Sequence, residues 1–468
     1  MNSWLKRVYD RCPIPVQSLL LSAFSVGLHR QRYGGRFAEF RELMDRSQWW
    51  DSDRMGVWQD ERLRTVVRHA YEHVPYYREL FDRHGINLDR FRGREDLPSI
   101  PFLTRDIIKA RLDDLRSRAP QHRRLAEGHT SGTTGSPLTL FYDADMMAIN
   151  YAALDRQYRW AGARLTRGGD RIAVIRGNII VPLGQTKPPF WRHNYLHNHL
   201  LLSNFHLSPG NLPAYHQALR EFRPVVLDGY PSSVYALAKL LLNCGETLPL
   251  KAVLTSSETL FDFQREAIER AFECRVFDYF GAAERVIFSV ECERHQGHHL
   301  CEEYGVTEIL DESNRPVPAG TEGCLVGTTL HNLGFPLIRY RSSDRTALKT
   351  EPCACGRSLP LVEDVTTKAE DLLRLRDGRL ISPSVLTHPF KPLDSIEASQ
   401  LVQTDLDRLV IRIIRRPEYS PADSEHLVRE LRARLGQDMR IDFEFVEAMP
   451  RTPSGKFKWV ISQVDLGI

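Results

Sequence analysis

A stretch of glycine and hydroxyl residues at positions 129–137, His-Thr-Ser-Gly-Thr-Thr-Gly-Ser-Pro, has the composition of a phosphate-binding loop. Its two glycines let the backbone approach a ligand closely and adopt left-handed conformations. The hydroxyl side chains and the backbone N–H groups around them could point several donors at phosphate oxygens. A polar turn between two strands has a similar composition. The loop alone therefore leaves a phosphate site and an ordinary turn equally open.

The chain lacks the patterns of two better-known nucleotide-binding loops. No Gly-x-x-x-x-Gly-Lys-Ser/Thr occurs in it, and the pair Gly455-Lys456 has no glycine at the required distance upstream. No Gly-x-Gly-x-x-Gly follows a predicted strand. These absences argue against P-loop kinases and ATPases and against a dinucleotide-binding domain.

Cysteine and histidine spacing indicates a metal site. A Cys-x-Cys pair follows an earlier cysteine and histidine that lie close together in the chain, and zinc prefers four nitrogen or sulfur ligands in a tetrahedron. Four protein ligands leave no open position, so such an ion would be structural. The alternative to a metal site is that these cysteines are unrelated thiols. His298 and Cys301 are rival ligands, because they lie next to the histidine or close to it in the chain. The Cys-x-Cys pair is Cys353 and Cys355, and the earlier residues are Cys292 and His299.

Four further histidines lie among aromatic residues and leucines at positions 191–206. Imidazole groups there could hold an anionic or polar part of a substrate. The alternating His-x-His spacing is also that of one face of a strand. The four are His193, His197, His199 and His206.

Length and composition describe a globular protein of several domains. A chain of 468 residues is too long for one ordinary core and suggests two to four domains. Hydrophobic residues make up 42% and charged residues 26%, which excludes a disordered or fibrous class. The net charge of +3, from 63 basic and 60 acidic residues, offers no general basis for binding nucleic acid, and we expect no such partner.

The N-terminal segment predicts a cytoplasmic protein. No secretory signal is visible, so the eight cysteines should be reduced or bound to metal. The apolar run at 16–28 is interrupted by serines and is shorter than the roughly 20 residues that span a bilayer. We expect a helix packed on the main domain. A helix resting on a membrane surface, as a peripheral association, stays open as the alternative.

Periodicity divides the chain into three regions. Residues 1–120 are mainly helical by the recurrence of apolar residues at three and four positions. Residues 121–369 alternate β-branched runs with helical stretches, which predicts an α/β core with parallel strands. A serine of the turn 230–233 is well placed as the N-cap of a helix over 234–242. Residues 370–468 form a smaller α+β unit. The predicted core strands are 171–175, 225–229, 251–255 and 276–280.

Four segments in the same order resemble motifs of the adenylate-forming superfamily of ligases. The glycine-rich loop resembles its phosphate loop, and residues 280–284, Phe-Gly-Ala-Ala-Glu, resemble its Tyr-Gly-x-Thr-Glu motif. Residues 336–344 resemble the motif that ends in a ribose-binding aspartate, and residues 450–456 resemble the C-terminal motif with a catalytic lysine. The resemblance implies an α/β fold with a large N-terminal domain of several subdomains and a small mobile α+β C-terminal domain.

The resemblance also implies roles for individual residues. Glu284 would bind Mg²⁺, a cation that prefers oxygen ligands, and Asp344 would accept hydrogen bonds from the ribose hydroxyls. Lys456 would bridge the attacking carboxylate and the α-phosphate. Ser257 and Glu258 stand where the family has its adenine-contacting turn, or they form a helix N-cap and its neighbour. The remaining nucleotide-binding candidates are Thr130, Ser131, Gly132, Thr133, Thr134, Gly135, Phe280, Gly281 and Lys368.

Within the superfamily the chain is similar to the phenylacetate–CoA ligase-like group and to its capsule-associated, CapK-like branch. The helical N-terminus with residues 74–78, Val-Pro-Tyr-Tyr-Arg, and the Cys-Gly-Arg at 355–357 carry the first similarity. The segments 32–35 and 228–232 carry the second. The group's pattern of one cysteine, one histidine and a Cys-x-Cys matches Cys292, His299, Cys353 and Cys355, so the resemblance implies that these four are the zinc ligands.

The resemblance therefore implies an AMP-forming carboxylate ligase that uses ATP and Mg²⁺ to make an acyl-adenylate and then an acyl-CoA. Transfer to an amine or hydroxyl, in polysaccharide or natural-product biosynthesis, and a non-catalytic nucleotide-binding relative are the alternatives. A small carboxylic acid and a thiol, amine or hydroxyl acceptor would be the partners, and monomer and homodimer both stay open. The chain departs from the family at Phe280, at Ala283 and in the hinge segment 367–371, where Lys368 replaces an arginine.

Overall fold

The computed structural model describes residues 3–130, 138–166, 168–365, 372–381, 383–390, 392–393, 395–449 and 458–465. Its N-terminal part is helical, as predicted. Helix α4 buries Leu63, Val66 and Ala70 on one face, and Pro75 opens the next helix where the periodicity breaks. These helices are α1 (Ser3–Arg11), α2 (Ile14–Tyr33), α3 (Phe37–Ser47), α4 (Ser52–His73), α5 (Pro75–His84) and α6 (Arg105–Ala110).

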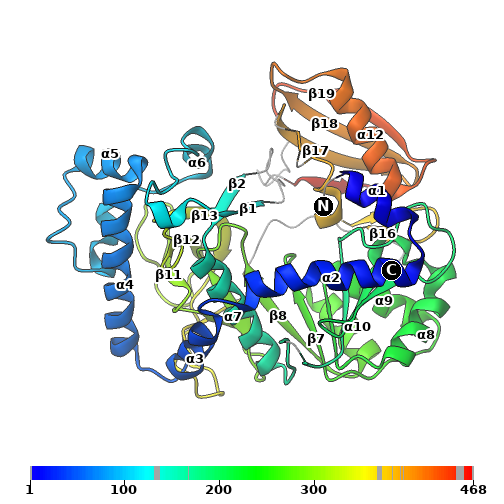
Figure 1. Ribbon diagram of the computed structural model, residues 1–468, viewed down its shortest axis with the longest axis horizontal. Coiled ribbons are helices and arrows are strands. Elements are labelled where there is room, and N and C mark those ends of the chain that lie inside the picture. The colour runs from blue at the N-terminus through cyan, green and yellow to red at the C-terminus, as the bar shows by residue number, and fades with distance from the viewer. Residues whose placement is uncertain are drawn as a thin grey trace.

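A nine-stranded mixed sheet forms the centre of the described chain (Figure 1). Its five central strands run parallel in the order β8-β7-β6-β3-β5, and antiparallel strands extend both edges. The predicted parallel α/β core is confirmed. The strands are β3 (Ile172–Arg176), β4 (Trp191–Asn194), β5 (His199–Ser203), β6 (Val226–Gly229), β7 (Ala252–Ser256), β8 (Arg275–Gly281), β9 (Phe288–Glu291), β10 (His298–Leu300) and β14 (Leu361–Val362).

Helices cover both faces of this sheet. On one face of the sheet, three helices share an apolar cluster with the strands: α8 (Leu212–Phe222), α9 (Pro231–Asn243) and α10 (Asp262–Phe272). On the other face, α7 (Ala144–Trp160) contributes to further apolar clusters. The predicted serine N-cap is wrong. Helix α9 begins at Pro231, whose fixed φ suits the first helical position, so Ser232 and Ser233 lie inside the helix.

Two smaller sheets stand beside the central one. The hairpin of β1 (Ala126–His129) and β2 (Thr139–Tyr142) flanks the glycine-rich loop. A three-stranded antiparallel sheet consists of β11 (Gly305–Leu310), β12 (Gly323–Thr329) and β13 (Tyr340–Thr346).

The C-terminal residues form a separate lobe above the central sheet (Figure 1). Its sheet has the order β19-β18-β17-β20, and α12 packs on it through Leu427 and Leu431. This is the predicted α+β texture, while the exact domain limits stay a prediction. The elements are β15 (Leu373–Arg374), β16 (Leu380–Ile381), α11 (Pro383–Leu386), β17 (Ile396–Asp405), β18 (Arg408–Arg415), α12 (Pro421–Leu435), β19 (Arg440–Phe445) and β20 (Val460–Ser462).

Candidate functional site

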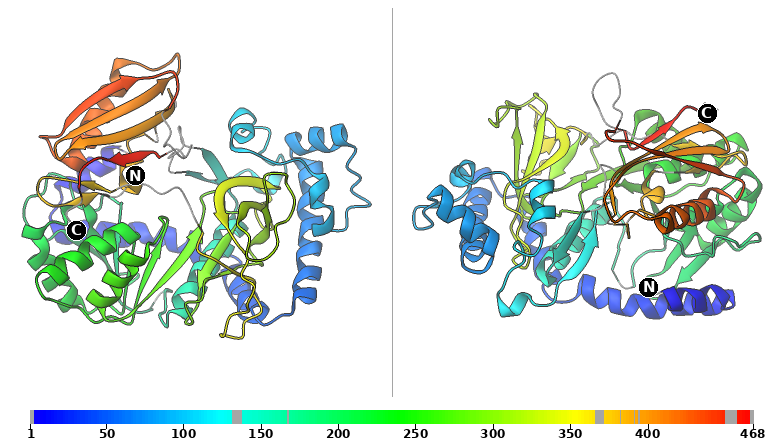
Figure 2. Two further views of the ribbon diagram at one scale, coloured as in Figure 1. Left: turned by 180° about the vertical axis from the view of Figure 1, so that it is seen from behind. Right: turned by 90° about the horizontal axis from the view of Figure 1, so that it is seen from above.

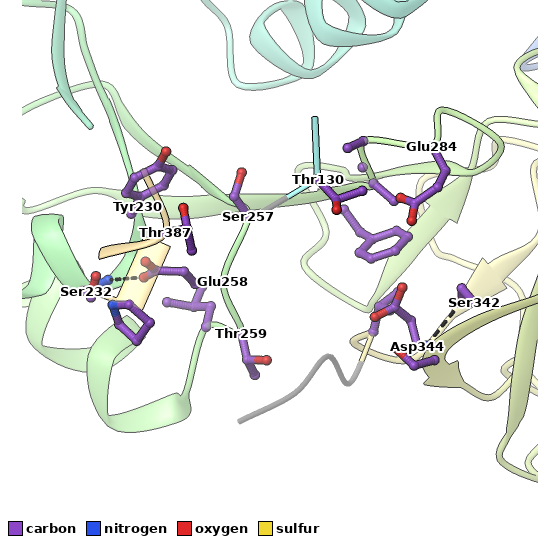
Figure 3. Close-up of a pocket in the computed structure, with 18 of the residues that line it drawn as sticks. Thr130, Tyr230, Ser232, Ser257, Glu258, Thr259, Glu284, Ser342, Asp344 and Thr387 are labelled. Carbon is purple, nitrogen blue, oxygen red and sulfur yellow. Dashed lines mark hydrogen bonds between the residues drawn. The ribbon is translucent and has the colours of Figure 1, made fainter. Parts of the chain in front are cut away.

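A cleft of about 1250 Å³ opens between the central sheet, the three-stranded sheet and the C-terminal lobe. The carboxyl ends of β7 and β8 form its floor, and in doubly wound α/β sheets ligands bind at these strand ends. Lys458 and Ser462 line it from the C-terminal lobe. Several residues singled out from the sequence line it together, and Figure 3 labels five of them: Thr130, Ser257, Glu258, Glu284 and Asp344. Phe280 and Gly281 also line it.

Thr130 closes the base of the glycine-rich loop. Its backbone N–H donates to Leu138 O at 3.0 Å, and its Oγ1 accepts from Leu138 N at 2.9 Å. The guanidinium of Arg105 lies 3.3 Å from the same Oγ1. Thr130 and Leu138 are both buried. The two ends of the loop are therefore held together at the mouth of the cleft.

Several sequence candidates lie outside the described residues. These are the loop residues Ser131, Gly132, Thr133, Thr134 and Gly135, the hinge residue Lys368 and the C-terminal Lys456. Their roles stay predictions.

Glu284 follows β8 and faces the cleft beside β13. Its Oε1 accepts a hydrogen bond from the Tyr340 hydroxyl at 2.8 Å. Burial raises the pKa of Tyr340, and the nearby carboxylate of Glu284 raises it further. Because Tyr340 remains a donor, one oxygen of Glu284 is oriented while the other stays available to a cation.

Asp344 lies on the same strand as Tyr340, at the opposite side of the cleft from Glu258 (Figure 3). Its backbone N–H donates to Ser342 Oγ at 3.1 Å. A carboxylate is an acceptor only, so Asp344 suits a ligand that presents two neighbouring hydroxyl groups.

Ser257 and Glu258 form a tight turn after β7. Ser257 has φ +72°, a left-handed conformation that turns the chain into the cleft. Glu258 Oε2 accepts from the backbone N–H of Ser232 at 3.1 Å, at the start of α9 (Figure 3). The alternative of a cap for the next helix is wrong, because α10 begins at Asp262 and Phe261 precedes it.

An acid–imidazole cluster on the cleft floor, in which His298 is the buried member, was missed from the sequence. Asp278 Oδ1 accepts a hydrogen bond from Thr255 Oγ1 at 2.5 Å, and His298 Nε2 lies 3.8 Å from Asp278 Oδ2 and 3.4 Å from Asp364 Oδ1. Burial raises the pKa of Asp278 to about 7. Asp278 is on β8 and His298 on β10, so only the sheet order brings them together. An acid two residues before Phe280 was the available signal.

The four zinc candidates come together on the far side of β10 from the cleft. Their ligand atoms all lie within 4.8 Å of one another. Cys292 Sγ is 3.5 Å from Cys353 Sγ, and Cys355 Sγ is 3.4 Å from His299 Nε2. Zinc–sulfur bonds of about 2.3 Å place tetrahedral sulfurs about 3.8 Å apart, which these separations approach. The donor set therefore fits a tetrahedral ion.

Hydrogen bonds around the cluster support metal binding. His299 Nδ1 lies 3.2 Å from Leu359 O, which leaves the Nε2 lone pair directed at the thiols. Burial opposes ionisation of Cys355, but the backbone N–H and guanidinium of Arg357 outweigh it and lower the pKa of that thiol. The rival Cys301 instead accepts from Arg156 at 3.5 Å. His298, the other rival, points to the cleft because successive strand residues face opposite sides.

The histidines between positions 191 and 206 do not line the cleft. His193 lies on the edge strand β4 and His199 on its neighbour β5, and His197 contacts His29 at 3.0 Å. Burial lowers the pKa of His199 to about 3 and that of His206 to about 4, so these groups are neutral. The strand-face alternative fits His193 and His199, and a role of the four histidines in holding an anionic or polar part of a substrate stays a prediction.

Comparison with known proteins gives similarity along nearly the whole chain. Residues 373–463 match the family model described as the CapK C-terminal domain. The chain is 25% identical to the protein CapK of Staphylococcus aureus over 481 residues, covering 98% of this chain and 100% of CapK. It is 26% identical to a phenylacetate-coenzyme A ligase of Thermus thermophilus over 446 residues, covering 87% of this chain and 96% of that ligase.

Solved structures share the fold. A crystal structure of 2-hydroxyisobutyryl-CoA ligase in the postadenylation state matches with a TM-score of 0.56 at 21% identity, over 89% of this chain and 93% of that one. The same ligase with 2-HIB-AMP and CoA in the thioesterification state matches with a TM-score of 0.57 at 20% identity, over the same shares of the two chains.

Proposed function

Because this chain has the fold of the adenylate-forming CoA ligases and a C-terminal domain of the CapK type, we propose that it is an AMP-forming carboxylate ligase. It activates a carboxylic acid with ATP as an acyl-adenylate, releases pyrophosphate and transfers the acyl group to the thiol of CoA. The observation that carries this proposal is the convergence of Thr130, Glu284 and Asp344 on one cleft.

In this proposal, different residues of the cleft bind different parts of the nucleotide. Thr130 positions the loop that holds the phosphates, and Glu284, oriented by Tyr340, is an oxygen ligand for Mg²⁺. Asp344 accepts from the ribose hydroxyls. Lys456 is assigned the role of neutralising the charge that builds between carboxylate and α-phosphate. Bound Mg²⁺ supplies charge neutralisation at the phosphates.

The test is ATP–pyrophosphate exchange across a panel of carboxylic acids. Exchange that depends on one class of acid is expected, and Lys456→Ala should lower its rate about 10²–10³-fold, as for the loss of one transition-state donor. Lys187→Ala, an exposed lysine outside the cleft, is the matched control. Exchange that is absent with every acid, or equal in both variants, contradicts the proposal.

A second acceptor class is the alternative to CoA. The small lobe matches the CapK C-terminal model, and this lobe supplies one wall of the cleft. The resemblance to the capsule-associated branch makes transfer of the same acyl-adenylate to an amine or hydroxyl group the second candidate. Once the acid is identified, AMP release with CoA is compared with release on candidate amines and hydroxyl compounds. Acceleration by CoA supports the first candidate.

We also propose a structural zinc ion on Cys292, His299, Cys353 and Cys355. The preparation should contain about one zinc per chain, because structural sites of this type bind tightly at neutral pH. Cys355→Ser should lose the metal, whereas Cys244→Ser, an exposed cysteine elsewhere, should retain it. Metal-free protein from a preparation without chelator contradicts this assignment.

A further inference from the structure

Helix α2 presents its apolar residues to solvent and its polar residues to the protein. The outward residues Leu19 and Phe24 are each 60% exposed, and Leu20 is 43% and Val16 39% exposed. Ser18 and Ser25 on the opposite side are buried, and so is Gln17 at the border between the two sides. Spacings of three and four residues put the four apolar side chains on one stripe of the helix. We call Val16, Leu19, Leu20 and Phe24 the outer stripe.

The buried polar face has a structural role. Strand β4 is the edge strand of the central sheet, and its unpaired N–H groups need acceptors. His193 N donates to Ser18 Oγ at 3.2 Å, and Tyr195 N donates to Ser22 Oγ at 2.9 Å. Asn194 Nδ2 donates to Ser25 Oγ at 2.8 Å. The serines of α2 therefore cover the sheet edge, and this requirement explains the inner face only.

The outer stripe has no such explanation within the described residues. Seen from above, α2 runs along one edge of the molecule, with its outer side turned away from the sheet (Figure 2). Exposed apolar residues scattered singly are normal, but a continuous stripe on one helix marks an interaction surface.

Charge at both ends of the stripe identifies the partner. Arg7 and Arg11 are exposed on α1, and Arg30 is exposed on the last turn of α2. Helix α2 contains no acidic residue, and the single acid of α1, Asp10, is paired with Lys6 at 2.9 Å. An apolar stripe flanked by cations is the pattern of a helix that lies in the interface of an anionic bilayer.

A second copy of this chain fits less well. Antiparallel packing of two α2 stripes would bring Arg7 and Arg11 of one protomer next to Arg30 of the other, and parallel packing would bring identical cations together. Like charges across an interface disfavour that pairing. Among the described helices, none is long and apolar enough to cross a bilayer, so the contact lies in the surface plane.

We propose that the outer stripe of α2 and the cations around it dock the protein on an anionic membrane surface. The probe is cosedimentation of the full chain with vesicles of phosphatidylcholine containing about one-third phosphatidylglycerol, compared with phosphatidylcholine alone. Binding to the anionic vesicles is expected, with much weaker binding to the neutral ones and at high salt.

Two double variants separate the contributions. Leu19→Ser with Phe24→Ser should weaken binding at least 100-fold, because each side chain loses most of its transfer into the interface. Arg7→Gln with Arg11→Gln should weaken it about 25-fold, since a cation near an anionic leaflet contributes about fivefold. Val57→Ser is the control, because Val57 is 63% exposed on α4, away from the stripe.

Unchanged thermal unfolding and unchanged ATP–pyrophosphate exchange verify that the variants are folded. Three outcomes overturn the proposal. The first is the absence of binding to anionic vesicles, and the second is binding that the Leu19/Phe24 variant retains. The third is a dimer in sedimentation equilibrium that the same variant dissociates, which would assign the stripe to a second copy.

Discussion

Replacement of Thr130 by valine tests whether the hydrogen bonds at the base of the glycine-rich loop matter for nucleotide binding. Valine keeps the shape of threonine but removes Oγ1, so the buried Leu138 N–H loses its acceptor at 2.9 Å and Arg105 loses a contact at 3.3 Å. A buried donor left without its partner costs about 1–3 kcal/mol. Because these hydrogen bonds hold the two ends of the proposed phosphate loop together, we expect a loss of that size to appear in ATP binding, as an affinity about 5- to 150-fold lower.

The assay is ATP binding by calorimetry, with the KM for ATP in pyrophosphate exchange as a second readout. Thr130→Ser retains an oxygen at the same position and should stay within a few-fold of the wild type. Thr139→Val is a control in the same hairpin, because Thr139 Oγ1 makes only a longer, exposed contact of 3.4 Å with His129. Wild-type affinity in a folded Thr130→Val protein, or an equal loss in Thr130→Ser, would refute the reasoning.

Three further predictions concern ions and buried charge. Glu284→Gln should raise the Mg²⁺ concentration that half-saturates pyrophosphate exchange at least tenfold, and an unchanged Mg²⁺ titration excludes Glu284 as a ligand. Arg156 and Glu303 form a buried pair at 2.7 Å. Glu303→Ala should therefore lower the free energy of unfolding in urea by about 3–5 kcal/mol, whereas the double change Arg156→Met with Glu303→Leu should recover most of it. The pKa of Asp278 is raised from 3.8 to about 7, so this carboxyl adds stability below pH 4 that is lost as pH rises to 7. Relative to wild type, the free energy of unfolding of Asp278→Asn in urea should thus increase by up to about 4 kcal/mol between pH 4 and pH 8, and a pH-independent difference would contradict the raised pKa of Asp278.

Periodicity in the sequence predicted the central strands because a parallel sheet covered on both faces needs continuous β-branched runs. Strands β6 and β7 lie within a residue of their predicted limits. The start of α9 was misplaced, because a proline at the first helical position was interpreted as part of the preceding turn.

Residues of the cleft were predictable where they belong to a short sequence motif, as Glu284 and Asp344 do. Contacts between residues far apart in the sequence were not predictable, because the order of the strands determines them. Asp278 and His298 meet only because β9 lies between β8 and β10 in the sheet. Glu258 interacts with the first turn of a helix 26 residues earlier in the chain.

For helix α2, helical periodicity predicts the wrong face as the buried one. Apolar residues at helical spacing predict a face turned toward the core. Here the edge strand β4 supplied N–H donors that only hydroxyl side chains could satisfy, and this requirement turned the polar face inward.

The Cys292–Cys353 pair has a consequence for the stability of the segment between the two cysteines. They lie 61 residues apart, and the whole three-stranded sheet that carries Tyr340 and Asp344 lies between them. An ion held by the cluster would close this segment into a ring in the folded protein. Because an unfolded chain rarely keeps such a site, the free energy of metal binding would add to the free energy of folding. The metal cluster, remote from the reacting groups, would thus hold in place the strand on which the nucleotide's sugar is proposed to rest.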